Sequence, residues 1–363
     1  MTIDQGLQVS QNLASPLSES PGVQPVKWGW VTRRVPFRFL GKHRTDLETP
    51  PRVGDLVVGR VLEIGKHLRI EGRDSRRVTL FPGDLIGGAF GNRYATDQFE
   101  GYVEPFTNVF HVLGIGGVFG IVRSQNDRMS ERPTTVELVG YVTDPARRRR
   151  SLLEYGLHRR ALNSRKTGNC RTVLVVGASM NSGKTTAAAY TIFGLQRTGA
   201  RVHAAKLTGT ACAKDTAFFL DAGASKVADF SDCGWPSTYL ADLSDLLDIN
   251  TRLRAALLDD AEYFVMEVAD GLRQRETEML LESDAFRDTI DAVIFAGPDA
   301  LSAESGVRRL KELGYHVVAV SGLVSTSSLG INEVTRVTGL PCLNNAGLST
   351  GQIRQVLDQV SVR

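Results

Sequence analysis

The pattern of hydrophobic and polar positions divides the chain into two differently organised halves. In the first half, between Val26 and about Val142, short apolar runs such as 56–58, 78–81 and 118–122 are separated by Gly, Asp, Asn and Pro. Apolar runs bounded by turn-forming residues are typical of strands in barrels and sandwiches. We therefore expect residues 26–145 to form a smaller, all-β barrel or sandwich domain.

In the second half, from Arg171 onward, apolar strand-like runs alternate with helical patterns. The helical patterns include 185–198 and 303–313, and the expected strands cover 172–176, 201–205, 263–268, 292–296 and 316–320. Parallel strands need crossover connections of about this length, which are usually helices. Residues 171–363 are therefore predicted to form a doubly wound α/β domain with a mostly parallel sheet.

Two other segments carry weaker patterns. Residues 1–25 are rich in Ser, Gln and Pro and hold few large apolar side chains, which predicts a disordered tail. Between the halves, Arg147–Arg150 precede Leu153 and Leu157, whose spacing predicts a basic helical connector over 146–170. This charge run is compatible with nucleic-acid binding, although such runs are more often simply solvated.

Composition and charge narrow the class of protein without identifying it. A chain of 363 residues with 42% hydrophobic and 23% charged residues is typical of a soluble globular protein with two domains. It contains neither an apolar run long enough to cross a membrane nor a basic and then apolar leader, so we expect no membrane association. The net charge of +3 conceals 25 Lys and Arg against 17 Asp and Glu in residues 1–170, and 18 against 23 thereafter.

Cysteine and histidine spacing indicates neither a disulfide framework nor a zinc site. The six histidines show no paired ligand spacing, and no CxxC spacing links the four cysteines, Cys170, Cys212, Cys233 and Cys342. A protein of the reducing cytoplasm fits this pattern best.

The strongest chemical signal lies in residues 172–186. An apolar strand runs into Gly-Ala-Ser-Met-Asn-Ser-Gly-Lys-Thr-Thr, and an Ala-rich helix follows directly. In this context backbone N–H groups and the positive end of the helix can surround a polyphosphate. Lys184 would neutralise the β- and γ-phosphates, and the Thr185 hydroxyl would ligate Mg²⁺. The expected cofactor is MgATP or MgGTP, held by Ala178, Ser179, Asn181, Ser182, Gly183, Lys184, Thr185 and Thr186.

The loop departs from the usual GxxxxGK[ST] spacing at its first position. Ala178 occupies the slot that normally holds glycine, and Gly177 lies one position earlier. If the slot needed a positive φ, alanine would cost about 1–2 kcal/mol there, whereas a negative φ would cost nothing.

Charged residues follow two of the other expected strands. Glu267 and Asp270 come at the end of the strand 263–268, where α/β sheets place ligand chemistry, so we expect Glu267 to support the metal, with Asp270 as a further metal candidate. The alternative is that both residues cap the next helix.

Lys206 directly follows the strand 201–205 and is expected to hold an anionic acceptor or the γ-phosphate. Asp215 would reach Mg²⁺ or act as a base, or else lie on a solvated helix end. Ser321, after the strand 316–320, is a candidate for reading the base.

Several of these motifs together resemble one group of P-loop proteins. They are Gly183-Lys184-Thr185-Thr186, the lysine and Thr208-Gly209 after the second strand, and Glu267-Val-Ala-Asp-Gly271. They resemble the dethiobiotin synthetase, cobyrinate amidase-synthetase and molybdopterin-guanine-dinucleotide adaptor group, over about residues 171–345. The resemblance implies a P-loop NTPase domain with phosphate contact for Lys184, metal ligation for Thr185 and Glu267, and substrate or phosphate contact for Lys206.

The function that we expect is ATP-dependent phosphoryl transfer to, or activation of, a small anionic substrate. Lys184, Lys206, Glu267 and Asp215 are the catalytic candidates. One alternative is a nucleotide-controlled adaptor that binds a protein or a cofactor precursor through the β half. Another is a nucleic-acid-linked kinase or ATPase that uses the basic connector. The acceptor, the base of the nucleotide and the oligomeric state, including a homodimer, are left open.

Overall fold

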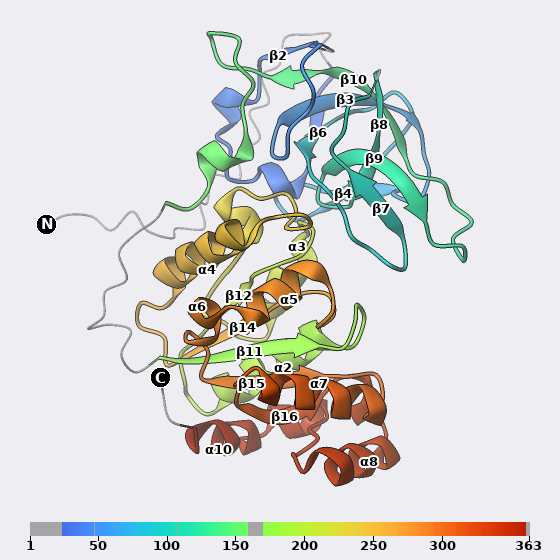
Figure 1. The fold of residues 1–363 in the computed structure, drawn as a ribbon. Coiled ribbons are helices and arrows are strands. Elements are labelled where there is room, and N and C mark those ends of the chain that lie inside the picture. The colour runs from blue at the N-terminus through green and yellow to red at the C-terminus, as the bar shows by residue number, and fades with distance from the viewer. Residues whose placement is uncertain (1–23, 47, 107, 159–169, 361–363) are drawn as a thin grey trace, which may run out of the picture.

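The computed structural model describes residues 24–46, 48–106, 108–158 and 170–360. Figure 1 shows a strand-rich half, coloured blue to green, above a layered α/β half, coloured green to red. Most of the predicted tail, residues 1–23, lies outside the described residues. The expected division into a β half and an α/β half is visible in the ribbon, and the residue boundaries of the domains stay a prediction.

The strand-rich half is built from short strands around a buried hydrophobic core. Its strands are β1 (Val26–Trp28), β2 (His43–Arg44), β3 (Leu56–Glu63), β4 (Arg69–Glu71), β5 (Arg77–Thr79), β6 (Leu85–Phe90), β7 (Phe99–Tyr102), β8 (Val109–Gly114), β9 (Val118–Gln125) and β10 (Thr135–Val142). Hydrogen bonding follows β6–β3–β10–β8–β9, and β9 pairs with β6 again. The core inside includes Phe90 and Phe110, whose ring centroids are 5.2 Å apart in an edge arrangement.

The α/β half contains a six-stranded sheet in which every neighbouring pair is parallel. The strand order is β13-β12-β14-β11-β15-β16. These strands are β11 (Arg171–Gly177), β12 (Val202–Lys206), β13 (Lys226–Asp229), β14 (Tyr263–Glu267), β15 (Ala292–Ala296) and β16 (Val317–Ser321). Five of them match the expected strands. Only β13 was not expected, because its short Lys-Val-Ala-Asp run contains just two apolar residues.

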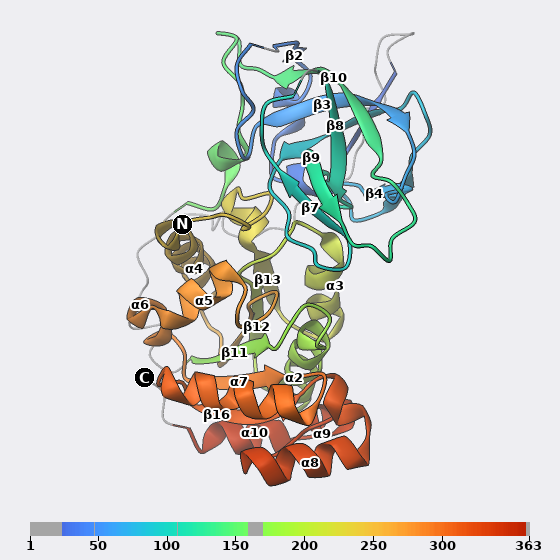
Figure 2. The ribbon, with the colours of Figure 1, turned by 45° about the vertical axis from the view of Figure 1, so that its right-hand side comes forward.

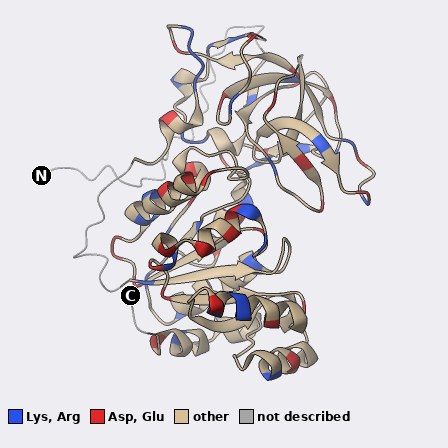
Figure 3. Cartoon of the chain, in the orientation of Figure 1, with Lys and Arg blue, Asp and Glu red and all other residues tan. Residues whose placement is uncertain are grey.

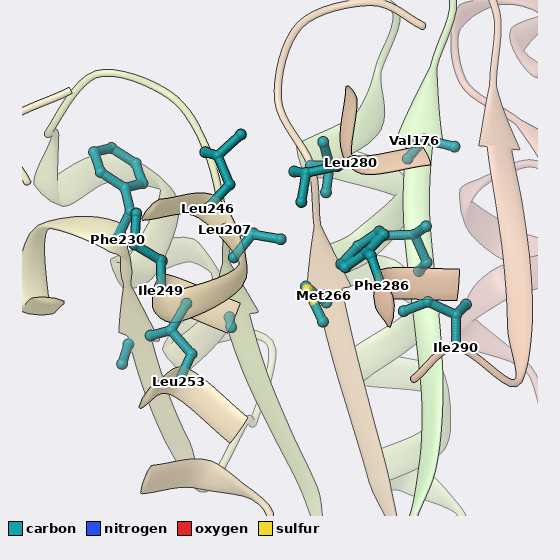
Figure 4. Close-up of a cluster of buried hydrophobic side chains, with 14 of the residues drawn as sticks. Val176, Leu207, Phe230, Leu246, Ile249, Leu253, Met266, Leu280, Phe286 and Ile290 are labelled. Carbon is teal, nitrogen blue, oxygen red and sulfur yellow. The ribbon is translucent and has the colours of Figure 1, made fainter. Parts of the chain in front are cut away.

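Helices cover both faces of this sheet because successive strand side chains point to opposite sides. In β11, Val173 and Val175 pack with α2, whereas Leu174 and Val176 belong to the cluster that includes α4, α5 and α6. Figure 4 shows this second cluster, with side chains from α4, α5 and α6 facing the strands. The helices are α2 (Lys184–Arg197), α3 (Ala213–Asp221), α4 (Leu243–Leu257), α5 (Arg275–Glu282), α6 (Asp284–Arg287), α7 (Ala300–Glu312), α8 (Ser328–Thr338), α9 (Asn345–Ser349) and α10 (Gln352–Asp358).

Charged residues in Figure 3 occur mainly on the helices and loops, and the strands of the parallel sheet are mostly tan. No helix within the described ranges combines the length and the apolar character that a membrane crossing requires.

The segment expected to be a basic helix differs from that expectation. Between 146 and 158 the structure has one 3₁₀ turn, η3 (Leu152–Tyr155), and no α-helix; residues 159–169 lie outside the described part. Tertiary ion pairs explain the difference, since Arg149 stacks on the Tyr141 ring and pairs with Asp46 and Asp55. The chain is thereby held in an extended path along the β half, which outweighs the helical spacing of two leucines.

Specific contacts fix the β half against the α/β half along β13 and α3, which lie beneath the β half in the turned view of Figure 2. Arg33 pairs with the buried Asp229 at 3.1 Å and with Asp232 at 2.7 Å. The buried carboxylate of Glu71 accepts a hydrogen bond from the backbone N–H of Ala213, in the first turn of α3, at 2.7 Å. These contacts place the β half beside the carboxyl ends of the parallel strands.

We predict that Arg33→Met destabilises the whole protein. The substitution would leave the Asp229 carboxylate buried without its cation, a defect that typically costs about 3–5 kcal/mol of unfolding free energy. Urea denaturation at neutral pH measures this loss. Arg34→Met is the matched control, because the Arg34 side chain is 36% exposed and its pair with Asp232 is longer, at 3.7 Å. Equal losses in the two variants would contradict the role assigned to Arg33.

Candidate functional site

The loop between β11 and α2 turns tightly through residues with positive φ. Gly183, at the start of α2, has a φ of 94°, and Asn181 has a φ of 61°. A Cβ at Gly177 would lie 2.4 Å from the Ser182 hydroxyl and 2.5 Å from the Ala296 carbonyl, so this glycine is required by close packing. Ala178 has a negative φ, so alanine is unstrained in the slot where glycine is usual.

Lys184 closes the loop on itself. Its side chain is buried, with 6% of the residue exposed, and Nζ donates to the Ser179 carbonyl at 2.7 Å. Burial lowers the pKa of Lys184. The buried Ser182 hydroxyl lacks a hydrogen-bond partner among the described residues. The loop therefore offers an ammonium and a hydroxyl that phosphate oxygens can satisfy, while Thr186 lies half-buried in the first turn of α2.

Thr185 and Glu267 meet across neighbouring elements. The Thr185 hydroxyl donates to Oε1 of Glu267 at 3.0 Å, because α2 starts where β11 ends and β14 pairs beside β11. Glu267 is 1% exposed, and its Oε2 atom has no hydrogen-bond partner in the described part of the chain. Carboxylate and hydroxyl oxygens are the ligands that Mg²⁺ prefers. These two oxygens and the orphaned Oε2 fit a magnesium ion.

The ranges that the structure describes contain no cluster of three or more His, Cys, Asp or Glu side chains that could bind a metal ion by themselves. Magnesium at a nucleotide does not usually require such a cluster, because its ligands are one or two carboxylates together with substrate phosphates and water.

Lys206 lies between two carboxylates. It is level with Glu267 in the parallel register of β12 and β14, and its Nζ is 3.6 Å from Oε1 of Glu267. It also forms an ion pair with Asp215, in the first turn of α3. Burial alone would lower the pKa of Lys206, but the charges of Glu267 and Asp215 raise it overall. Burial alone would raise the pKa of Asp215, and the Lys206 ammonium lowers it below the ordinary value.

Asp270 occupies a strained position beside the loop. It has a φ of 64°, which is uncommon for a residue other than glycine, and burial raises its pKa to about 6. The next residue, Gly271, packs so closely on the loop that a Cβ there would lie 2.3 Å from the Ala178 carbonyl. Neither acidic residue caps the next helix, because α5 has Gln274 as its N-cap. The capping alternative is therefore wrong.

Ser321 lies behind the loop. Its hydroxyl donates to the Leu343 carbonyl at 2.7 Å, and the following Gly322 approaches the loop so closely that a Cβ would lie 2.4 Å from the Ser182 carbonyl. The structure does not bring the Ser321 side chain into the cluster of Lys184, Thr185 and Glu267. Its contact with a base stays a prediction.

The β half contributes residues that sequence reasoning missed. Within the loop 91–98, which joins β6 to β7, the Asp97 carboxylate accepts a hydrogen bond from the Asn181 side chain at 3.1 Å. Asp270 also faces a small pocket between the halves, lined by Tyr94, Thr208, Thr210, Ser237, Tyr239 and Gln274. The glycine-dense stretch before Tyr94 gave no motif that links it to a loop 80 residues later, so no sequence signal pointed to these contacts.

No family model matches the chain, and no curated protein matches it. Among solved structures, a DUF1611 family protein from Anabaena variabilis aligns with 56% of this chain and 61% of its own length, at 14% identity and a TM-score of 0.38. The chain thus spans less than two thirds of that protein.

A nucleotide-binding protein from Archaeoglobus fulgidus in complex with ADP aligns with 54% of this chain and 91% of its own, at 12% identity and a TM-score of 0.37. The signal recognition particle 54 kDa protein from Aeropyrum pernix in complex with GDP aligns with 53% of this chain and 49% of its own, at 19% identity and a TM-score of 0.33. Likenesses this weak leave the assignment to rest on the geometry of the site.

We predict that Lys206→Met destabilises the protein most at neutral pH. The substitution leaves Glu267 and Asp215 without their shared cation, which costs about 3–5 kcal/mol at pH 7. The wild-type pair stabilises the fold above the ordinary Asp pKa, because the folded-state pKa of Asp215 is lowered. In the variant the unpaired carboxylates take up protons more readily, so the difference from wild type shrinks between pH 7 and about pH 5.

Urea denaturation at the two pH values measures this difference. Lys214→Met is the matched control, since Lys214 neighbours Asp215 in sequence but is exposed on α3. A deficit in Lys206→Met that stays the same at both pH values would contradict the charge assignment.

Proposed function

We propose that this protein binds a magnesium nucleoside triphosphate and transfers its terminal phosphoryl group to a small anionic substrate, or activates that substrate. One observation carries the proposal. The loop lysine and threonine, the Glu267 carboxylate and the Lys206 ammonium come from separate elements and meet at the carboxyl ends of three neighbouring strands. In open parallel sheets this is where ligands bind.

The side chains divide the work by charge. The loop N–H groups and the start of α2 would hold the phosphates, and Lys184 would leave the Ser179 carbonyl to bind the β- and γ-phosphate oxygens. Thr185 and Glu267, with Asp270 nearby, would hold Mg²⁺, which supplies positive charge to the phosphate oxygens when bound. Lys206 stays protonated because its pKa is raised, so it can stabilise charge that spreads over the transferring group.

The transfer needs no covalent intermediate on the protein. An oxygen of the acceptor attacks the γ-phosphorus, the bond from that phosphorus to the β-phosphate bridging oxygen breaks, and the diphosphate leaves with the electron pair. A carboxylate or phosphate acceptor is already deprotonated and needs no general base. Asp215 is then a charge partner that orients Lys206 rather than a base.

The finer fold assignments belong to the same proposal. Helices on both faces of an all-parallel sheet support a doubly wound P-loop domain, and the strand pairing that returns from β9 to β6 supports a small barrel in the β half. The meeting of Lys206 and Glu267 at neighbouring strand ends supports a relation to the dethiobiotin synthetase and adaptor group, in which a lysine and a metal-binding glutamate follow the corresponding strands. We propose membership of that group on these positions.

A nucleotide-controlled switch is the second candidate, and the contact between Asn181 and Asp97 favours it. Phosphate binding would rearrange the loop that carries Asn181, and the β half would lose or change this hydrogen bond. The two functions are separated by measuring the formation of nucleoside diphosphate with and without a pool of small carboxylates and phosphates. Acceptor-dependent formation supports the transferase, and slow turnover that ignores acceptors supports the switch.

Lys184→Ala is predicted to abolish turnover while the protein stays folded. Loss of a charge-stabilising donor aimed at the phosphates typically lowers kcat by about 10²–10³-fold. Phosphate release or coupled diphosphate detection measures the rate, and circular dichroism checks the fold. Lys311→Ala, an exposed lysine of α7, is the control and should keep the wild-type rate. Wild-type turnover in Lys184→Ala would refute the site.

Glu267→Gln is predicted to weaken the use of magnesium more than the binding of metal-free nucleotide. The amide keeps the size of the side chain but removes the negative charge that a divalent ion needs. We expect the Mg²⁺ concentration for half-maximal turnover to rise at least about tenfold, and calorimetry with and without Mg²⁺ measures the binding directly. Glu304→Gln, at an exposed position of α7, is the control. An unchanged magnesium dependence would rule out Glu267 as a ligand.

A further inference from the structure

Arg93 is a cation of the β half that forms no ion pair with the residues that the structure describes. It precedes Tyr94 in the loop 91–98, and its Nε atom is buried and lacks a hydrogen-bond partner among the described residues. One Nη atom donates to the Gln98 side-chain oxygen at 2.9 Å, which is a neutral partner. No carboxylate within the described ranges forms an ion pair with Arg93. Burial lowers the pKa of Arg93 to about 10, which still leaves it charged at neutral pH.

The guanidinium lies at the seam between the halves, next to the pocket. A Cβ at Gly114 would be 3.6 Å from Nη1 of Arg93 and 2.9 Å from the Thr210 methyl group, so the arginine and the pocket-lining threonine approach the same point. The carboxylates of Asp97, in the same loop, and of Asp270, across the seam, act on Arg93 and raise its pKa against the effect of burial. The charge of Arg93 in turn helps to lower the pKa of His67, which lies in the β half.

The pocket also reaches the phosphate site. A Cβ at Gly209, which lines the pocket, would lie 3.3 Å from Cε of Lys206. Asp270 lines the same pocket and is next to Gly271, which packs on the loop. Thr210 and Gly209, which line the pocket, therefore lie near Arg93 on one side and near Lys206 on the other.

We propose that this pocket is the acceptor subsite, and that Arg93 binds an oxyanion, either a carboxylate or a phosphate group, of a small substrate. A buried cation that is not paired with an anion is costly, and a ligand anion reduces that cost. The planar guanidinium presents paired N–H donors that match carboxylate and phosphate oxygens. The hydroxyls of Tyr94 and Ser237 would bind the rest of a polar molecule. The β half is thus a part of the substrate site.

This inference rests on the proposed function, because it names the second substrate of that reaction, but it is tested without turnover. Succinate and methylphosphonate serve as probes of the two oxyanion classes and are titrated by calorimetry and by thermal denaturation. The titrations use the protein saturated with a nonhydrolysable MgATP analogue and, separately, Lys184→Ala, in which the loop has lost its phosphate-binding lysine. Binding of the analogue is measured on its own, so a loss of nucleotide binding can be distinguished from a failure of the pocket to bind the probe.

We expect at least one probe to bind and to raise the Tm of both proteins. Arg93→Gln should weaken that binding at least about tenfold, which is the loss expected for one charged hydrogen-bonding partner. Arg93→Lys should also bind more weakly than wild type, since it keeps the charge but loses the paired donors. Arg76→Gln, an exposed arginine of the same half, is the control and should bind as wild type does.

The outcomes distinguish a carboxylate substrate from a phosphorylated one, and ligand binding from a purely structural role of Arg93. Binding of succinate alone assigns a carboxylate substrate, and binding of methylphosphonate alone assigns a phosphorylated one. If Arg93 served only to hold the halves together, its variants would lower the Tm without ligand and keep the probe affinity, and that result overturns the proposal. Failure of both probes to bind wild type at millimolar concentrations also overturns it. Should Arg93→Gln not fold, the affinity of Arg93→Lys decides.

Discussion

The parallel register of β12, β14 and β11 is the constraint on which the site depends. In this register Lys206 pairs beside Glu267, and Glu267 pairs beside Val175, two residues before the end of β11. Since α2 starts a few residues after β11, Thr185 reaches Glu267 without any long side chain having to extend. A shift of one residue in β14 would turn the Glu267 side chain to the other face of the sheet and would separate it from both partners.

The same edge of the sheet explains why the halves are joined so specifically. Carboxyl ends of parallel strands leave short loops and helix starts, which are poorly covered by the helices of the domain itself. The β half covers part of this edge, with Glu71 on the start of α3, Arg33 on the end of β13 and Asp97 on the phosphate loop. These contacts are polar and directional, so they fix the position of the β half rather than merely burying apolar surface.

Local patterns predicted the parts of the site that lie on single elements. The strand, loop and helix around Lys184 could be read from the sequence because all three are contiguous, and Glu267 could be read because strand ends are where such sheets bind ligands. The strained Asp270 and the unstrained Ala178 could not be distinguished in advance, because φ depends on the packing of Gly271 and Gly177.

Residues that meet only through tertiary structure gave no signal. Tyr94 and Asp97 reach the loop and the pocket from the other half of the chain, and nothing in their surroundings indicates a partner at Asn181. The expected helix after Arg147 is absent between 146 and 158 for the same reason. Leucine spacing is a local property, whereas the pairs of Arg149 with Asp46 and Asp55 connect positions about a hundred residues apart.

The balance of charge at the seam gives these separate observations one explanation. Lys206 is neutralised by Glu267 and Asp215. Two further cations, Lys184 and Arg93, approach the site from opposite halves, and neither forms an ion pair with a carboxylate in the described part of the chain. Lys184 uses a neutral carbonyl and Arg93 a neutral amide as substitutes, and burial lowers the pKa of both. Neutral partners stabilise a buried charge less well than anions do. Two anions, one at the loop and one at the pocket, would therefore stabilise these two cations, which is the arrangement that a reaction between a nucleotide phosphate and an anionic acceptor requires.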